Sequence, residues 1–391
     1  MKVTTPETEG AQKRESVFHR LYTGTGAFDI IGKRSRWYIA LGLLVLLCIG
    51  AIGFKGFNLG IDFEGGTKIS VPAVGAQGPI ETDAVQSAFS EAIGHPAETV
   101  QVVGAGANQS IQVRSSSLTV DQVMEAKQEI FNQVQPLDGT GKPSQQVLSD
   151  SAVSGTWGGE ITTQALLALG VFLVLVTIFL AFYFEKWMAV AALAALLHDV
   201  VVTAGIYSLV GFEVTPSTVI GLLTILGFSL YDTVVVFDKV KENTRGLLSM
   251  TRRTYPEAAN LAVNQTLMRS INTSVIALLP VLGLLVVGAG LLGVGVLRDL
   301  ALVQLVGMIT GVVSSIYLAT PLLVDLKMSE SKYRSHAKKV EQRRAKAAAR
   351  EAGEDVPEEP KRPVPAGATT RQQPAARPAG KAARPSGKRR R

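Results

Sequence analysis

Residues 222–238 read LLTILGFSLYDTVVVFD, an apolar run with a carboxylate near its middle, Asp232. The run belongs to a segment long enough to cross a lipid bilayer. A charged side chain at that depth costs a few kcal/mol or more, so it is rarely idle and usually faces the inside of a helix bundle. The stretch therefore predicts a membrane protein in which Asp232 either carries protons or locks two helices together.

Five further runs of spanning length accompany this one. The chain has 391 residues, 47% of them hydrophobic, a share carried by long apolar runs that ordinary soluble proteins lack. The first run follows a polar segment and has no small-x-small cleavage site, so it is predicted as a retained anchor. The predicted spans are 37–54, 161–184, 187–210, 214–237, 271–292 and 300–323.

Charge placement predicts the topology. The net charge is +7, and Lys and Arg gather in 33–36, in 239–253 and after the sixth run. By the positive-inside rule these segments are cytoplasmic, and so are both termini. The expected organisation is a cytoplasmic segment 1–36, a first transmembrane helix 37–54, an extracytoplasmic domain 55–160, a five-helix block 161–325 and a basic, largely disordered tail 326–391. The tail, which ends in KRRR at 388–391, is either simply solvated or contacts anionic lipid or ribosomal RNA.

The segment 55–160 is predicted to be a small α+β domain. Strand-like patterns cover 67–71, 99–103, 110–114 and 145–153, and helical patterns cover 81–93 and 118–134. The second helix has a capping box at Thr119 and Gln122, with Leu118 and Val123 placed as a hydrophobic staple. The order β-α-β-β-α-β predicts a ferredoxin-like sandwich. The fold class is thus a polytopic α-helical membrane protein of six transmembrane helices, with a small ferredoxin-like extracytoplasmic domain.

Four ionisable residues are candidates for a proton relay. Asp232 shares a helical face with Ser229, and Arg269, placed at the start of the fifth span near the cytoplasmic edge, is expected to approach it from the next helix. Arg269 could instead snorkel to the interface. His198 and Asp199 in the third span either extend a proton path or form a satisfied buried pair.

Glycines mark a second set of candidates, with structural roles. Gly221 and Gly227 are predicted to allow close approach of neighbouring helices. Residues 60–67 read GIDFEGGT, and Gly60, Asp62, Gly65 and Gly66 are predicted to form a tight connector between membrane and strand. No Gly-Lys-Ser/Thr follows, so a nucleotide loop is not expected. The single cysteine, Cys48, excludes an intrachain disulfide, and no metal site or cofactor is predicted.

Four segments together resemble SecF of the SecD/SecF family, part of the bacterial Sec protein-export system. They are 60–67, 197–203 (LHDVVVT), 227–243 and 269–274 (RSINTS), and the resemblance covers about residues 30–325. Residues 153–160 depart from the family pattern, because the usual Val-Gly-Pro is missing. The resemblance implies a non-enzymatic subunit that pairs with a separate SecD, giving a twelve-helix assembly similar to resistance–nodulation–division transporters. Asp232 and Arg269 match the family's membrane Asp and Arg implicated in proton flow.

The resemblance further implies partners and a location. The chain is expected in the bacterial cytoplasmic membrane, where it uses the proton-motive force to help a preprotein leave the SecYEG channel, with YidC and YajC as accessory partners. Three other interpretations stay open. They are a resistance–nodulation–division exporter of drugs or lipids, a non-transporting scaffold for SecD, and an intramembrane aspartyl protease. The protease would use Asp199 and Asp232, but no Gly-x-Gly-Asp motif is present and the two are expected at different depths.

Overall fold

The computed structural model describes residues 28–104, 106, 109–291 and 295–352, and those up to Gln342 belong to one compact unit. Within these ranges six helices are long and apolar enough to cross a membrane, which confirms the predicted number. The predicted segment before residue 28 and the tail from 353 to the basic end at 388–391 lie outside the described residues.

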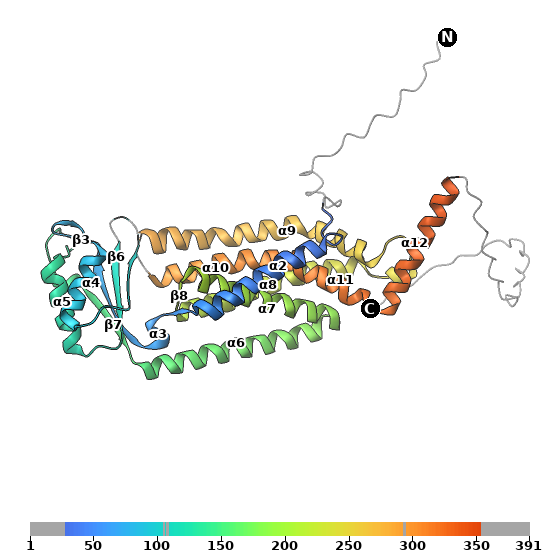
Figure 1. The fold of residues 1–391 in the computed structure, drawn as a ribbon. Helices are drawn as coiled ribbons and strands as arrows, with labels where there is room; N and C mark the ends of the chain where they lie inside the picture. The colour runs from blue at the N-terminus through green and yellow to red at the C-terminus, as the bar shows by residue number, and fades with distance from the viewer. Residues whose placement is uncertain (1–27, 105, 107–108, 292–294, 353–391) are drawn as a thin grey trace, which may run out of the picture. The chain divides into compact units, whose positions relative to one another are not determined.

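The membrane helices run side by side (Figure 1). The third, α7, carries the small residues Ala191, Ala192 and Ala195, which are fully buried and let its neighbours approach closely. The sixth crossing changes to a π-helical turn at Ser315–Ala319 between α10 and α11. The helices are α2 (Arg34–Lys55), α6 (Gly155–Tyr183), α7 (Lys186–Val210), α8 (Pro216–Asn243), α9 (Tyr255–Gly283), α10 (Gly295–Ser314) and α11 (Thr320–Met328).

The fifth crossing begins much earlier than predicted. We expected its start at residue 271, whereas α9 begins at Tyr255. Thr254 and Glu257 form a capping box there, with proline at the start of the helix, so local chemistry begins the helix in a polar stretch. Hydropathy detects only the apolar part of a helix, and the predicted boundary was therefore wrong.

The α+β domain has the predicted ferredoxin-like topology. Its sheet has the strand order β5-β6-β2-β7, and each neighbouring pair is antiparallel. Both helices cover the same face of the sheet (Figure 1), over a core that includes Val71, Phe89 and Ile130. The elements are β2 (Gly66–Pro72), α4 (Thr82–Ile93), β5 (Thr99–Val103), β6 (Ser110–Ser115), α5 (Val120–Val134) and β7 (Ser149–Val153).

Local signals in this domain were mostly correct. The capping box of Thr119 and Gln122 is present at the start of α5. The last strand is shorter than the predicted 145–153, because Gln145–Val147 forms a 3-10 turn and β7 starts at Ser149. Strand β7 pairs with β2 only from Ser149 to Val153, so the residues before it have no strand to join.

A compact connector joins the domain to the bundle. Strand β1 (Asn58–Leu59) pairs in parallel with β8 (Glu213–Val214), and the short helix α3 (Ile61–Glu64) follows. Gly65 and Gly66 then adopt φ of +81° and +128°, values that residues with a Cβ rarely adopt. A Cβ at Gly65 would also overlap the backbone of Gly155, where α6 begins. The glycines therefore allow three chain segments to touch.

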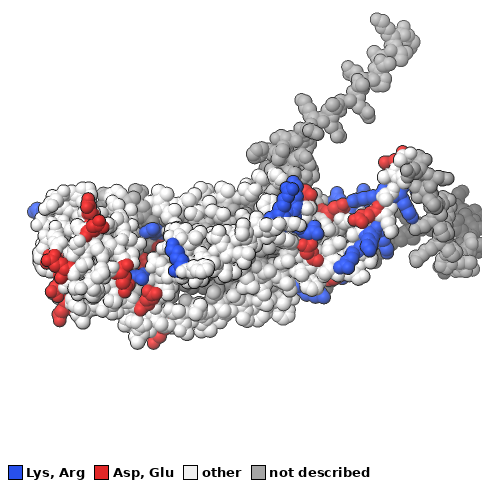
Figure 2. Space-filling model, viewed as in Figure 1, with Lys and Arg blue, Asp and Glu red and all other residues white. Residues whose placement is uncertain are grey.

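Charged side chains are divided between the two ends of the molecule (Figure 2). Asp and Glu outnumber Lys and Arg on the visible face of the α+β domain, whereas Lys and Arg gather, together with some Asp and Glu, at the end of the bundle where α2 begins and α11 ends. The helix α12 (Ser331–Glu351) occupies the first part of the segment that was predicted as a basic, largely disordered tail. This distribution agrees with the charge bias from which the topology was predicted.

Candidate functional site

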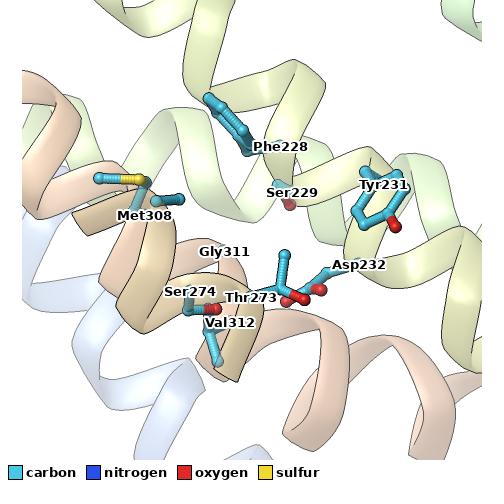
Figure 3. Close-up of a pocket in the computed structure, with 10 residues that line it drawn as sticks. Phe228, Ser229, Tyr231, Asp232, Thr273, Ser274, Met308, Gly311 and Val312 are labelled. Carbon is cyan, nitrogen blue, oxygen red and sulfur yellow. The ribbon is translucent and has the colours of Figure 1, made fainter. Parts of the chain in front are cut away.

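Asp232 lies in the interior of the bundle, at a small cavity between α8, α9 and α10. Its exposed fraction is 6%, so the prediction that it faces the bundle is confirmed. The cavity measures about 30 Å³, which is room for a water molecule, and its polar lining includes Ser229, Thr273 and Ser274. Figure 3 shows Ser229 and Asp232 of α8 close to Thr273 and Ser274 across this space. A carboxylate beside a water-sized cavity can exchange a proton without leaving the bundle.

Arg269 lies next to this cavity but does not form an ion pair with Asp232. It sits well inside α9, so its predicted place at the head of the fifth helix was wrong. Its side chain is exposed on the outer surface of the bundle and makes a long hydrogen bond of 3.5 Å to the Tyr231 hydroxyl. Within the described residues no Arg269–Asp232 pair closes to 4.0 Å. The two groups are neighbours rather than a closed pair.

Asp199 is a hydrogen-bonding centre that joins three helices. It is 1% exposed on α7, and one carboxylate oxygen accepts hydrogen bonds from Ser229 Oγ of α8 at 2.5 Å and Ser314 Oγ of α10 at 2.9 Å. Its other oxygen lies 3.1 Å from His198 Nδ1. Hydrogen bonds of this kind offset the cost of burying a carboxylate. His198 Nε2 is buried and has no partner among the residues that the structure describes.

The levels of Asp199 and Asp232 in the bundle differ by about one helical turn. Ser229 contacts Asp199 and lies three residues before Asp232 on the same helix, a rise of roughly 4.5 Å. The offset is small, and the expectation of different depths stays a prediction. Both oxygens of Asp199 are already engaged, so the pair does not offer the shared, open site that an aspartyl protease requires.

Small residues hold α8 and α10 close together beside the site. A Cβ at Gly307 would overlap Ile225, and one at Gly311 would press on Ser229. A Cβ at Gly221 would overlap Val303, so this glycine lies at a close helix contact, as predicted. A Cβ at Gly227 would meet no atom of another segment within 4 Å, so the predicted close contact at Gly227 was wrong. The Gly307-x-x-x-Gly311 spacing is a helix-packing signal that the sequence analysis did not use. It also missed Ser314, which donates a hydrogen bond to Asp199.

The remaining candidates lie at the connector. Gly60 lies against Glu213 and the Val214 carbonyl, and Asp62 lines a polar cavity with Lys68 and Asp299. Gly60 contacts Glu213 and Val214 just before α8, more than fifteen residues ahead of Asp232, so these residues belong to a structural junction rather than to the buried site. Over the described ranges, no group of three or more His, Cys, Asp or Glu is arranged to hold a metal ion.

Fold and site together define a class of protein. It is a multi-pass helical membrane protein with one ferredoxin-like domain after its first span and carboxylates buried at the centre of its bundle. The family model described as "Protein export membrane protein SecD/SecF, C-terminal" matches residues 133–329, and the "SecD/SecF GG Motif" matches residues 50–75.

Known proteins agree with this match. Protein translocase subunit SecF of Mycobacterium tuberculosis is 51% identical over 360 residues, which are 91% of this chain and 80% of that one. SecF of Streptomyces coelicolor is 42% identical over 95% of this chain and 98% of its own. The crystal structure of Thermus thermophilus SecDF superposes with a TM-score of 0.65 at 32% identity, over 77% of this chain and 38% of that one. The chain belongs to the SecD/SecF family of protein-export membrane proteins.

Proposed function

We propose that this chain acts with a separate SecD subunit and uses the proton-motive force to complete preprotein export through the Sec translocase. The observation that carries the proposal is Asp232, a buried carboxylate that faces a water-sized cavity and forms no ion pair within the described residues. A proton that moves down the membrane potential releases about 2.3 kcal/mol per 100 mV, and a carboxylate in the bundle is a suitable carrier.

The two carboxylates have different parts in this proposal. Asp199 has a polar contact at each carboxylate oxygen, and its hydrogen bonds from Ser229 and Ser314 connect α7 to α8 and α10. Asp232 faces the cavity and is free to change its protonation state. Ser229 donates a hydrogen bond to Asp199 and also lines the cavity at Asp232. A charge change at Asp232 therefore occurs about one helical turn from the hydrogen bond that connects α8 to α7. A local proton transfer can thereby alter helix packing, provided the packing has two stable arrangements.

An exposed cation supports a partner on one face of the bundle. Arg269 and Tyr231 lie on the outer surface of α9 and α8 within the membrane-spanning segments. A guanidinium that faces lipid at that depth is costly, whereas a protein surface can satisfy it. We place SecD on this face, and its fusion in the Thermus thermophilus SecDF relative is consistent with direct pairing.

The proposal extends to the setting of the complex. The basic end of the bundle supports a cytoplasmic location for both termini, with the α+β domain on the outer side of the bacterial cytoplasmic membrane, where it can meet the emerging preprotein. SecYEG is the expected channel, and YidC and YajC are accessory partners. Contact of the basic tail with anionic lipid or ribosomes concerns residues beyond 352, whose structure is not described.

The test is proton uptake and preprotein translocation in energised inverted vesicles that contain this chain and SecD. We expect Asp232→Asn to abolish both uptake and late-stage export. Asp238→Asn, a matched change on the same helix at a carboxylate bonded by Tyr183, should leave both near normal. Normal uptake with failed export would make Asp232 a structural hinge, and normal behaviour in both assays would favour a scaffold that does not transport protons.

A further inference from the structure

A second cavity lies at the basic end of the bundle, remote from Asp232. It measures about 400 Å³ and lies where α7 and α9 begin and where α8 and α11 end. Three of these helices, α7, α8 and α9, also carry the buried site. The polar residues that line it include Glu185, Lys241, Arg245, Tyr255, Lys327 and Tyr333.

Three carboxylates near this cavity are paired with other cations. Glu185 forms an ion pair with Lys327, whose side chain is 3% exposed, so these two residues together add no net charge to the cavity lining. Farther out, Lys239 lies 2.7 Å from Glu242, and Lys332 lies 2.9 Å from Glu330. The carboxylate of Glu185 offsets the desolvation cost of burying the Lys327 ammonium group.

Two cations at the cavity remain without an acidic partner. Lys241 and Arg245 form no ion pair within 4.0 Å and no side-chain hydrogen bond, as far as the described residues extend. Lys241 Nζ lies 6.0 Å from the centre of the Tyr183 ring, a weak cation–π contact. The nearby Asp238 accepts a hydrogen bond from Tyr183 instead. The cavity wall therefore carries two positive charges that no ion pair within 4.0 Å engages, as far as the described residues extend.

The rest of the cavity combines apolar surface with aromatic side chains. Met188 and Leu247 supply apolar lining, and the Tyr255 hydroxyl is buried with no hydrogen-bond partner in the described structure. Tyr183 ends α6 and Trp187 lies in the first turn of α7, a placement typical of aromatic residues at a membrane–water boundary. An anion with an apolar tail, located at that boundary, matches both parts of the lining.

We propose that this cavity binds the headgroup of an anionic phospholipid, with its phosphate at Lys241 and Arg245 and its first methylenes against Met188 and Leu247. Lipid phosphate is the anion that is held at this depth, and basic pockets between helix ends are suited to it. A lipid bound there contacts the ends of α7, α8 and α9 together. It would restrain the helices that carry Asp199 and Asp232.

The experiment is native mass spectrometry of the purified full chain in detergent, titrated with phosphatidylglycerol or phosphatidylcholine. The Lys241→Gln/Arg245→Gln variant removes both unpaired charges. Each basic residue near an anionic lipid surface raises the binding affinity by about fivefold. Removal of two such residues should therefore weaken phosphatidylglycerol binding roughly thirtyfold. Phosphatidylcholine binding should change little. The matched control is Lys338→Gln/Lys339→Gln, which removes the same charge from exposed positions on α12 and should keep wild-type binding.

Three results would overturn the proposal. They are an equal loss in the α12 control, no preference of the wild type for phosphatidylglycerol, or displacement of the lipid by millimolar inorganic phosphate. The last result would mean that the site takes free phosphate. If the double glutamine variant does not fold, Lys241→Arg/Arg245→Lys keeps both charges and must retain the lipid preference, while Lys241→Gln alone must weaken it.

Discussion

The contact between Gly307 of α10 and Ile225 of α8 allows a quantitative test of how closely these helices pack. An alanine Cβ at position 307 would overlap three carbon atoms of Ile225, whose exposed fraction is 1%. Overpacking of this kind costs about 1–3 kcal/mol, against a gain of about 1 kcal/mol from replacing a helical glycine by alanine. We expect Gly307→Ala to be neutral or to destabilise the bundle by up to about 2 kcal/mol.

A matched substitution isolates the steric cost. Gly227 also lies within a membrane helix, but no atom lies within 4 Å of its Cβ position. Gly227→Ala should therefore stabilise the protein by about 1 kcal/mol. The difference between the two alanine variants, about 1–3 kcal/mol, measures the α8–α10 contact alone.

The assay uses the chain's own cysteine. Cys48 is the single cysteine and is 1% exposed, so a fluorogenic maleimide reacts with it only when the bundle opens. Unfolding in mixed micelles of increasing SDS content gives the midpoint for each variant. Ile225→Val should cost about 0.5–1.5 kcal/mol in the wild type and less in the Gly307→Ala background. Equal stability of Gly307→Ala and Gly227→Ala would refute the close packing that positions Ser229.

Two further predictions concern the α+β domain and its connector. Thr119→Ala should remove the capping box of α5 at a cost of about 1 kcal/mol, seen as roughly fivefold faster hydrogen exchange at the Gln122 amide; unchanged exchange would mean that the cap does not hold the helix. Gly65→Ala should destabilise more than Gly78→Ala in the same Cys48 assay. Both glycines have positive φ, but only Gly65 lies against the backbone of another segment.

The sequence predicted those parts of the fold that depend on local pattern. Alternation over residues 110–114 and the capping box at Thr119 are short-range signals, and both correspond to the observed β6 and α5. The error at residue 145 has a different origin, because a strand extends only as far as its partner does. Strand β7 begins at Ser149, where pairing with Ser70 of β2 begins.

The candidate site was predicted in composition but only partly in geometry. Burial of Asp232 followed from its apolar surroundings, and this was correct. The position of Arg269 was wrong because hydropathy cannot detect the polar first turns of α9. The bonds from Ser229 and Ser314 to Asp199 depend on the register of three helices, which one sequence does not contain. The Gly-x-x-x-Gly spacing in α10 was the available indication of that register.

The pairing of β1 with β8 has a mechanical consequence. These two-residue strands bind the end of α2 to the start of α8, and α3 continues from β1 directly into the sheet of the α+β domain. From Pro216 to Asp232, α8 forms a lever arm of roughly 24 Å. A tilt of about 5° pivoting at Asp232 would carry the tip of that arm about 2 Å, and the strand pair would pass this displacement to the domain without any change in the domain's own fold.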